Sequence, residues 1–208
     1  MNKFSIFFIN SLDNIILIMD VSDQNFEKKQ EIANKFMEFF LKHGMVKTIV
    51  NDVSKELHMS KKTIYKYFKG GKQDCLYFIF SNIGHQARMI IEKDIMNLSS
   101  SWEKIEYLIR QIYEVSVPYV LGNAAENDED YVVENRIVGN AFKDVFQDLF
   151  IKNINQGINK KEFSTSNANQ TFNFIYGVIL ESMIMIHDDP AINILDQVIK
   201  TVRKILKK

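Results

Sequence analysis

The sequence contains little cysteine, proline or glycine, and each shortage excludes a class of fold. Its single cysteine, Cys75, cannot form an internal disulfide and fits no cysteine-based metal pattern, which agrees with a reducing, cytoplasmic location. Eight glycines and two prolines in 208 residues are too few for the turns of a β-sandwich or β-barrel. No apolar run reaches the roughly 18 residues of a membrane span. Because 46% of the residues are hydrophobic, the chain is predicted to be globular and all-α.

A net charge is also absent, since 26 basic residues balance 26 acidic ones. The charges are nevertheless unevenly placed along the chain. Seven lysines lie between Lys47 and Lys72, against only Asp52 and Glu56. This local excess of positive charge can attract phosphates although the whole protein is neutral. An opposing acidic block consists of Glu126, Asp128, Glu129, Asp130 and Glu134.

Residues 4–19, FSIFFINSLDNIILIM, are strongly apolar and leave two interpretations open. They resemble a signal peptide or membrane anchor, although three polar residues interrupt the run and no small-residue cleavage site follows. Alternatively, they form a loosely packed arm, or they result from an upstream start codon with Met19 as the natural beginning. We therefore treat residues 1–24 as an N-terminal arm outside the predicted domains.

Apolar residues recur at helical spacing from residue 25 onward. The first stripe ends at Gly44, and Thr48 and Ser60 are the expected caps of two short helices that follow. Gly70-Gly71 then breaks the chain, which places a small basic domain at residues 25–71.

Residues 72–208 are expected to form a second, larger helical domain. Its last helix is predicted to begin with Asp189 as its cap and Pro190 in its first turn, and to reach about Leu206. The preceding helices are predicted at residues 72–96, 102–121, 131–155 and 170–186.

Two short helices joined by a tight turn are the layout of a DNA-reading helix-turn-helix, which we place at about residues 48–67. Three apolar residues of the first helix and Ile64 of the second are spaced to form a small core. With Ile64 inward, the second helix exposes Lys61, Lys62, Tyr65 and Lys66. The alternative is that a lysine-rich helix is only a solvated face. The coincidence of cap, turn, buried stripe and exposed lysines favours DNA binding.

Residues 32–76 resemble the N-terminal domain of TetR-family transcriptional regulators, and the stretch MSKKTIYKYFK is the most specific part of the resemblance. The sequence departs from the family pattern at three places. His58 stands where the family usually has a turn glycine, and Ser54 replaces a usual alanine. Gly70-Gly71 makes the link to Lys72 one residue longer than usual. The matching residues are Ala33, Phe40, Gly44, Thr48, Val50, Val53, Met59, Ser60, Lys61, Thr63, Ile64, Tyr65, Tyr67, Phe68, Lys69 and Lys72.

This resemblance implies a transcriptional regulator that binds double-stranded DNA, and specifically a repressor released from a palindromic operator by a small molecule. It implies that Thr48 caps its helix against the DNA backbone, and that Lys62 and Lys66 reach base edges. Phosphate contacts are implied for the helix start at Ser60 and for Lys61, Thr63, Tyr65, Tyr67 and Lys72.

The family also implies a homodimer whose last two helices form a four-helix interface. Two apolar stripes fit this expectation, and the alternative is that they are intrachain core, which would leave a monomer. In a dimer the two recognition helices should lie about 34–36 Å apart to meet successive major grooves. The predicted interface residues are Phe172, Ile175, Ile179, Met183, Ile186, Ile194, Val198 and Ile205.

A small-molecule effector cavity is a further implication of the resemblance, and it belongs to the larger domain. Arg110 and Glu181 are candidate anchors for a polar ligand, because they lie within apolar helices. The alternative for each aromatic candidate is ordinary core packing. The candidate lining residues are Trp102, Tyr113, Tyr119, Phe142, Phe146, Tyr176 and Met183.

Nothing in the sequence predicts an enzyme, a metal site or a cofactor. The four histidines lack ligand spacing, and the segment KGGKQ lacks the spacing and hydroxyl of a phosphate-binding loop. Two alternatives to a ligand-released repressor stay open. One is a DNA-binding regulator without a small-molecule effector, and the other is a membrane-tethered helical interaction protein anchored through residues 4–19.

Overall fold

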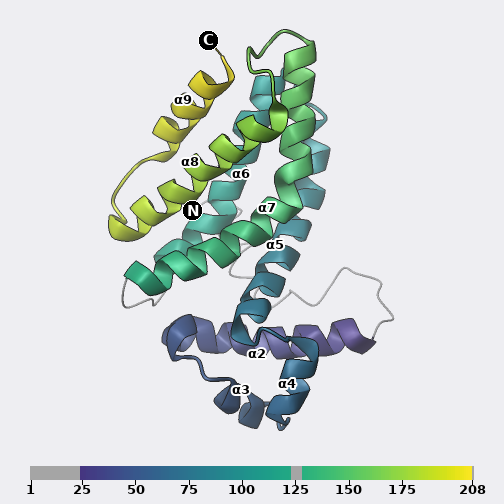
Figure 1. Cartoon of the computed structure of the whole chain (residues 1–208), viewed down its shortest axis with the longest axis vertical. Helices are drawn as coiled ribbons and strands as arrows, with labels where there is room; N and C mark the ends of the chain where they lie inside the picture. The colour runs from purple at the N-terminus through teal and green to yellow at the C-terminus, as the bar shows by residue number, and fades with distance from the viewer. Residues whose placement is uncertain (1–23, 123–127, 208) are drawn as a thin grey trace.

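The computed structural model of the chain describes residues 24–122 and 128–207, without the side chains at 121–122 and 128–130. These ranges contain eight helices and no strand, which confirms the predicted all-α class (Figure 1). The two interpretations of residues 4–19 lie outside the described residues. The helices are α2 (Gln24–Lys47), α3 (Val50–Glu56), α4 (Lys61–Tyr67), α5 (Lys72–Ile95), α6 (Ser101–Gly122), α7 (Asp128–Asn159), α8 (Ala168–Asp188) and α9 (Leu195–Leu206).

Helices α2, α3 and α4 form one end of the molecule, which we call the head (Figure 1). Helix α2 lies across the head, with α3 and α4 packed on the side away from the other helices. Its regular part ends at Gly44, where φ is 74° and ψ is 158°, a conformation that only glycine adopts easily. The helix therefore stops at the glycine that the sequence predicts as its end.

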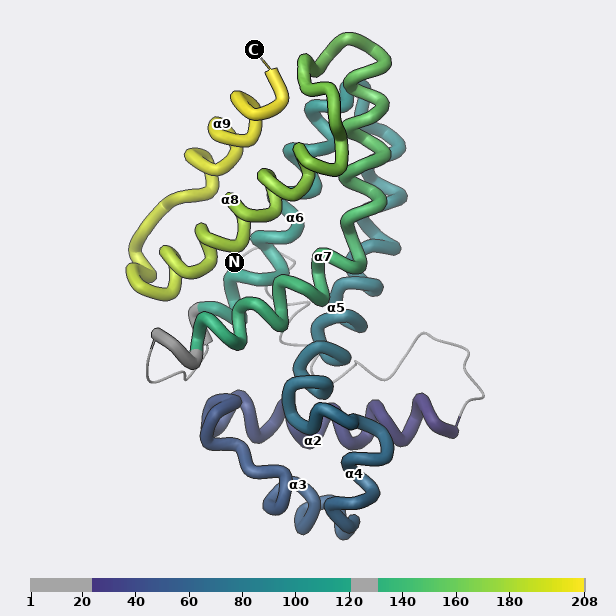
Figure 2. The backbone as a smooth tube through the Cα atoms, viewed as in Figure 1, coloured from purple at the N-terminus to yellow at the C-terminus, as the bar shows by residue number. Residues whose placement is uncertain are grey.

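Helix α5 leaves the head and continues into a bundle with α6 to α9, which we call the body (Figure 2). The first turns of α5 belong to the core of the head, since the ring of Phe78 lies 5.5 Å from that of Phe68 and 5.8 Å from that of Phe26. Farther along, α5 packs against α7, and α7 packs against α8. A single helix is thus shared by both parts of the molecule.

The last helix begins later than the sequence predicts. Asp189 is the C-terminal cap of α8, and its carboxylate accepts a hydrogen bond from the amide of Ala191 at 3.1 Å. Residues 190–191 form a turn, residues 192–194 belong to no helix or strand, and α9 starts only at Leu195. The predicted role of Asp189-Pro190 at the start of the last helix is therefore wrong. Asp189 caps the end of α8 and does not begin α9.

None of the helices in the described ranges combines the length with the apolar composition that a membrane-spanning segment needs.

Candidate DNA interface and effector cavity

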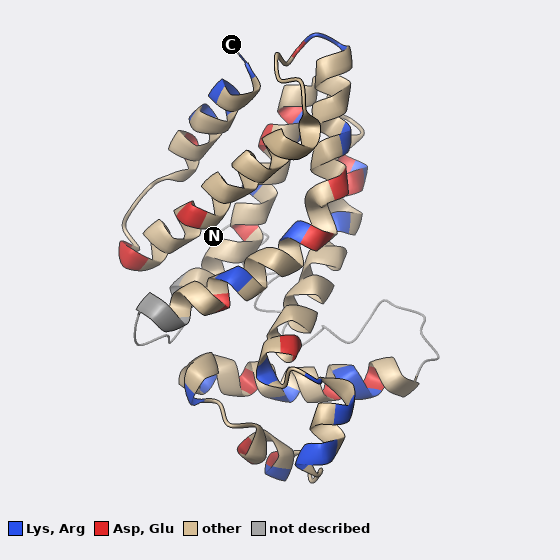
Figure 3. Cartoon of the chain, in the orientation of Figure 1, with Lys and Arg blue, Asp and Glu red and all other residues tan. Residues whose placement is uncertain are grey.

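Helix α4 separates its buried and exposed side chains sharply. Ile64 is fully buried in the core of the head, whereas Lys61, Lys62 and Lys66 are exposed and Tyr65 is 46% exposed. The hydroxyl of Ser60 accepts a hydrogen bond from the amide of Thr63 at 3.1 Å, which confirms the predicted cap. Lysines also gather on the head in Figure 3. Helix α4 therefore presents a basic face to solvent, and the buried Ile64 on its opposite side anchors the helix in the core of the head.

The turn between α3 and α4 sets the angle between the two helices. The amide of Met59 donates to the carbonyl of Ser54 at 2.9 Å, and that of His58 donates to the carbonyl of Lys55 at 3.0 Å. These two bonds form a Schellman motif, whose central position takes a left-handed conformation and usually carries glycine. His58 holds that position with a φ of 50°. The departure noted in the sequence is therefore a site of local backbone strain.

Thr48 does not cap α3. The N-cap is Ile49, which makes no side-chain capping bond, and the Thr48 hydroxyl donates instead to the carbonyl of Gly44 at 2.8 Å. Its amide donates to the carbonyl of Met45, and the residue is only 2% exposed. The predicted cap is wrong by one residue, because the turn after Gly44 directs the Thr48 hydroxyl into the head. We accordingly omit Thr48 from the side chains proposed to contact DNA.

Lys72 makes contacts within the protein. Its amine donates to the carbonyls of Met45 and Val46, both at 2.9 Å, and lies 3.5 Å from the carbonyl of Thr48. The start of α5 is thereby tied to the C-terminal end of α2, where helix carbonyls lack partners and favour a cation. A phosphate contact by Lys72 stays a prediction, and the structure gives this lysine a second role in holding the head together.

The other residues predicted to contact DNA lie on α4 or at its N-terminal cap. Tyr67 is half-buried, with the Lys66 amine 5.4 Å from its ring centre, and the hydroxyls of Thr63 and Ser60 are 2.9 Å apart. An open groove runs along the adjoining surface from the start of α3 to the start of α5. Its lining includes Ile49, Val50, Asn51, Lys61, Tyr65, Gly70, Gly71 and Lys72.

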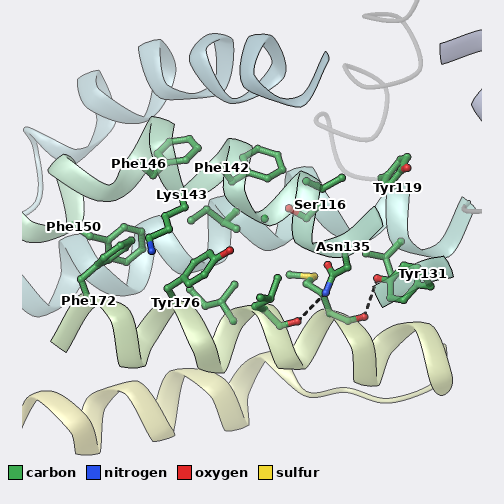
Figure 4. A pocket seen from close by; sticks show the side chains of 17 residues that line it. Ser116, Tyr119, Tyr131, Asn135, Phe142, Lys143, Phe146, Phe150, Phe172 and Tyr176 are labelled. Carbon is green, nitrogen blue, oxygen red and sulfur yellow. Dashed lines mark hydrogen bonds between the residues drawn. The ribbon is translucent and has the colours of Figure 1, made fainter. Parts of the chain in front are cut away.

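The body contains an apolar cavity of about 50 Å³ between α6, α7 and α8 (Figure 4). Five of the predicted lining residues meet there: Tyr119, Phe142, Phe146, Tyr176 and Met183. The sequence prediction missed other members of the lining, because nothing in a single helix marks which apolar side chains face a gap between three helices. The missed residues include Ser116, Tyr131, Asn135, Lys143, Phe150 and Leu180.

The remaining predicted lining residues lie elsewhere. Trp102 is buried beneath the guanidinium of Arg203, which is 5.3 Å from the centre of its ring. Arg110 is on the surface, paired with Glu106 at 2.7 Å, and Glu181 is exposed. The two polar anchors are therefore wrong for this cavity, because both side chains face solvent. Tyr113 is buried and forms a hydrogen bond with Ser182.

Burial keeps the tyrosines around the cavity protonated. It raises the pKa values of Tyr119 and Tyr131, to which the field of the Glu134 carboxyl adds, and outside the lining it raises the pKa of Tyr113 to about 12. Glu134 is itself only 1% exposed, and the Tyr119 hydroxyl donates to it at 3.4 Å. It therefore does not belong to a solvent-facing acidic block. The other members of that block lie outside the described side chains.

The apolar stripe of α8 that was predicted as a dimer interface points into the body. Phe172 and Ile179 line the cavity, and Ile175 is fully buried. Met183, Ile186 and Val198 are also buried within the chain, while Ile194 and Ile205 are half-buried. For the buried members the alternative of an intrachain core is correct. Amphipathic spacing identifies a buried face and does not say whether the covering surface comes from the same chain.

Comparison with known proteins adds a family match and several similar structures. Residues 37–77 match the family described as bacterial regulatory proteins, tetR family. Comparison with curated protein sequences gives no match.

Many solved structures resemble most of the chain, and three of them illustrate the likeness. RolR in complex with resorcinol has a TM-score of 0.68 at 8% identity, covering 88% of this chain and 89% of that one. FadR from Bacillus subtilis, in complex with stearoyl-CoA, has a TM-score of 0.59 at 19% identity, with 85% and 98% covered. A structure from Syntrophomonas wolfei str. Goettingen, described as a TetR-family transcriptional regulator, has a TM-score of 0.62 at 20% identity, with 87% and 93% covered. At these identities the likeness establishes the fold alone.

The family match lies mainly in the head. Its family match spans α4 with the exposed Lys61, Lys62 and Lys66, and the preceding turn has the geometry of a helix-turn-helix. The chain therefore carries, at residues 37–77, the helix-turn-helix domain of the TetR family of bacterial regulatory proteins, on a body with the fold of solved TetR-family regulators, as expected of a DNA-binding regulator.

Proposed function

We propose that the protein is a homodimeric repressor that binds a palindromic operator and is released from it by a small molecule in the body cavity. The observation that carries the proposal is α4, where one buried isoleucine holds three lysines and a tyrosine outward. A helix of this kind fits the major groove, where a lysine can donate to the acceptors on guanine. Lys62 is the proposed base contact, with Lys66 beside it.

A route from the cavity to the head supports release by a ligand. Phe142 lines the cavity, and a Cβ added at Gly84 of α5 would lie 3.3 Å from its ring. Two residues farther along α7, Asp144 accepts a hydrogen bond at 2.6 Å from the hydroxyl of Tyr77, in the second turn of α5. A ligand larger than the cavity must displace one of the three helices that enclose it, α6, α7 or α8. Any movement of α7 acts on α5 through these contacts, and α5 begins at Lys72 in the head.

The similar structures support a small-molecule effector as well. RolR holds resorcinol and FadR from Bacillus subtilis holds stearoyl-CoA, so two proteins of this fold bind small molecules. The cavity in the present chain lies between helices of a bundle and is mostly apolar, which is typical of ligand pockets.

The proposed dimer uses the outward face of α8 instead of its buried stripe. Phe174 is 68% exposed, Met185 is 40% exposed, and Val178 between them is half-buried. A Cβ added at Gly177 would meet nothing within 4 Å, so this face is open in the single chain. Residues 174, 178 and 185 fall on one side of the helix. We expect Phe174→Lys to convert a dimer into a monomer in sedimentation analysis, whereas the same change at exposed Asn173 should leave the dimer intact.

The experiment that tests DNA binding is fluorescence anisotropy with a duplex from the region upstream of the protein's own gene, and with a scrambled duplex, at two salt concentrations. Lys62→Ala should remove about 1–3 kcal/mol of the preference for the specific duplex if the lysine reads a base. Lys200→Ala, an exposed lysine on α9, removes the same charge away from the head and should have little effect. Absence of binding at low salt, or equal binding by both variants, would overturn the proposed role of α4.

A further inference from the structure

The two ends of the body cavity differ in their chemistry. Figure 4 shows Tyr119, Tyr131, Ser116 and Asn135 toward one end, and Lys143 with Phe150, Phe172 and Tyr176 toward the other. The middle of the cavity is lined by aromatic and aliphatic side chains. A ligand that fills it must therefore have an apolar body, and its polar group can be placed only near an end.

Lys143 is the cation at one end. Its amine lies 5.0 Å from the centre of the Tyr176 ring, and the side chain is half-buried. Among the described residues, no carboxylate lies within 4 Å of this amine. The same lysine also lines an open hollow on the outer surface of α7, together with Asn140 and Asp144, which places it at the mouth of the cavity. The Asp144 carboxylate there is already engaged by the Tyr77 hydroxyl.

The opposite end offers no cation. The Glu134 carboxyl is buried beside Tyr119 and accepts its hydrogen bond, and Lys143 is the only lysine or arginine among the described residues that line the cavity. A ligand carboxylate would therefore gain a charge-assisted hydrogen bond only at the Lys143 end, in a partly desolvated place. The lining thus defines one favourable orientation for an anion.

Ser116 adds a polar group to the interior of the cavity. The residue is 5% exposed and lines the cavity, so its hydroxyl can form a hydrogen bond with a bound molecule or a water there.

We infer that the effector is an amphipathic anion, an aromatic or alkyl body with a carboxylate or similar acidic group, whose charge pairs with Lys143. The inference rests on the proposed function, because it names the ligand class of the same cavity. The free volume of about 50 Å³ holds only a few atoms, so the body of such a ligand must displace side chains between α7 and α8. Lys143 and Asp144 are neighbours on α7, which puts the acidic group next to the contact between α7 and α5.

Three probes of matched shape test the inference: 4-phenylbutanoate, 4-phenylbutan-1-ol and 4-phenylbutylamine. Their binding to the full-length protein is measured by calorimetry, and a rise in melting temperature provides a second readout. We expect the acid to bind the wild type about tenfold more tightly than the alcohol, which corresponds to the gain from one charge-assisted hydrogen bond. The amine should bind most weakly.

Variants of α7 separate the charge of Lys143 from general effects. Lys143→Met keeps the length and apolar stem of the side chain and should abolish the preference for the acid, while leaving the alcohol's affinity within about twofold. Lys143→Arg should retain the preference. Lys152→Met is the matched control, since Lys152 is exposed on the same helix and does not line the cavity.

The outcomes distinguish this inference from the proposed function. Equal binding of acid and alcohol, a preference that survives Lys143→Met, or no binding of any probe at millimolar concentration would overturn the ligand class. The same protein is then tested for DNA binding with and without 4-phenylbutanoate. Binding of the acid without any release of DNA would leave the ligand class standing and contradict the proposed regulation. Failure to bind DNA at all would contradict the proposed function alone.

Discussion

The head and the body present their proposed binding groups in opposite directions. In the head, Lys61, Lys62 and Lys66 remain in water around the single buried Ile64, as a surface that contacts a partner as large as DNA requires. In the body, aromatic side chains turn inward around a cavity with one half-buried lysine at its mouth, as a site that surrounds a small molecule requires. One site therefore depends on the spacing within a seven-residue helix. The other depends on how three long helices meet.

The largest effect is expected from removing the side chain of Ile64, which anchors α4 in the core of the head. Ile64→Ala deletes a fully buried side chain and should destabilise the protein by about 2–5 kcal/mol, through lost burial and a residual cavity. Because α4 and its turn have few other supports, we expect faster hydrogen exchange in α3 and α4, loss of DNA binding, and unchanged probe binding in the body.

A matched change in the body provides the control. Ile109 of α6 is equally buried, and Ile109→Ala should loosen the body while the amides of α4 stay protected. If both variants speed hydrogen exchange in head and body alike, the two parts unfold as a single cooperative unit and do not differ in their local stability.

The same contrast explains what the sequence could predict. The positions of Ile64 and Lys62 on opposite faces of α4 follow from helical spacing alone, and the structure has them there. Phe172 and Ile175 are predicted as dimer-interface residues, but their spacing only identifies a buried face and does not specify what covers it, and the structure buries both side chains within the single chain. Nothing in the sequence around Lys143 distinguishes it from a lysine on the surface. Its place at the cavity mouth depends on Tyr176, which a different helix contributes.

The second test concerns the junction of the two parts. Lys72→Met removes an amine that donates to two helix carbonyls at 2.9 Å, and should lower the free energy of unfolding by about 1–3 kcal/mol. Affinity for all DNA sequences should fall as the head loses its tie to α5. The salt dependence separates the two roles of this lysine. A lost phosphate contact reduces the slope of log K against log salt by about one, whereas a purely structural role leaves the slope unchanged.

A weaker effect is expected where α5 meets α7 inside the body. The Arg88 guanidinium binds both oxygens of Asp148, at 2.6 and 2.7 Å, and these hydrogen bonds lower the pKa of the Asp148 carboxyl. A lowered carboxyl pKa stabilises the folded state above the unfolded value near 3.8, and this stabilisation is lost as the pH falls through the folded value. Asp148 is 68% exposed, so screening limits the contribution to less than about 1 kcal/mol.

Urea unfolding at pH 7 and at pH 3 measures this contribution. Asp148→Asn should lower stability at pH 7 and have a smaller effect at pH 3, where the carboxylate is being protonated. Glu181→Gln changes an exposed carboxyl without such a partner and should show no comparable pH dependence. An equal loss at both pH values for Asp148→Asn would mean that packing, and not the ion pair, connects the two helices here.

The smallest expected effect comes from the turn of the head. His58 holds a left-handed backbone at φ 50°, which costs an L-residue about 1–2 kcal/mol, and its side chain is exposed. His58→Gly removes that cost but adds about 0.5–1 kcal/mol of backbone entropy to the unfolded chain. A net stabilisation of about 0.5 kcal/mol is therefore expected in urea unfolding. His58→Ala distinguishes the backbone from the side chain, because alanine keeps the strained φ and should gain nothing. If alanine stabilises the head as much as glycine does, the imidazole itself is unfavourable there, and the Schellman turn holds its shape without measurable strain.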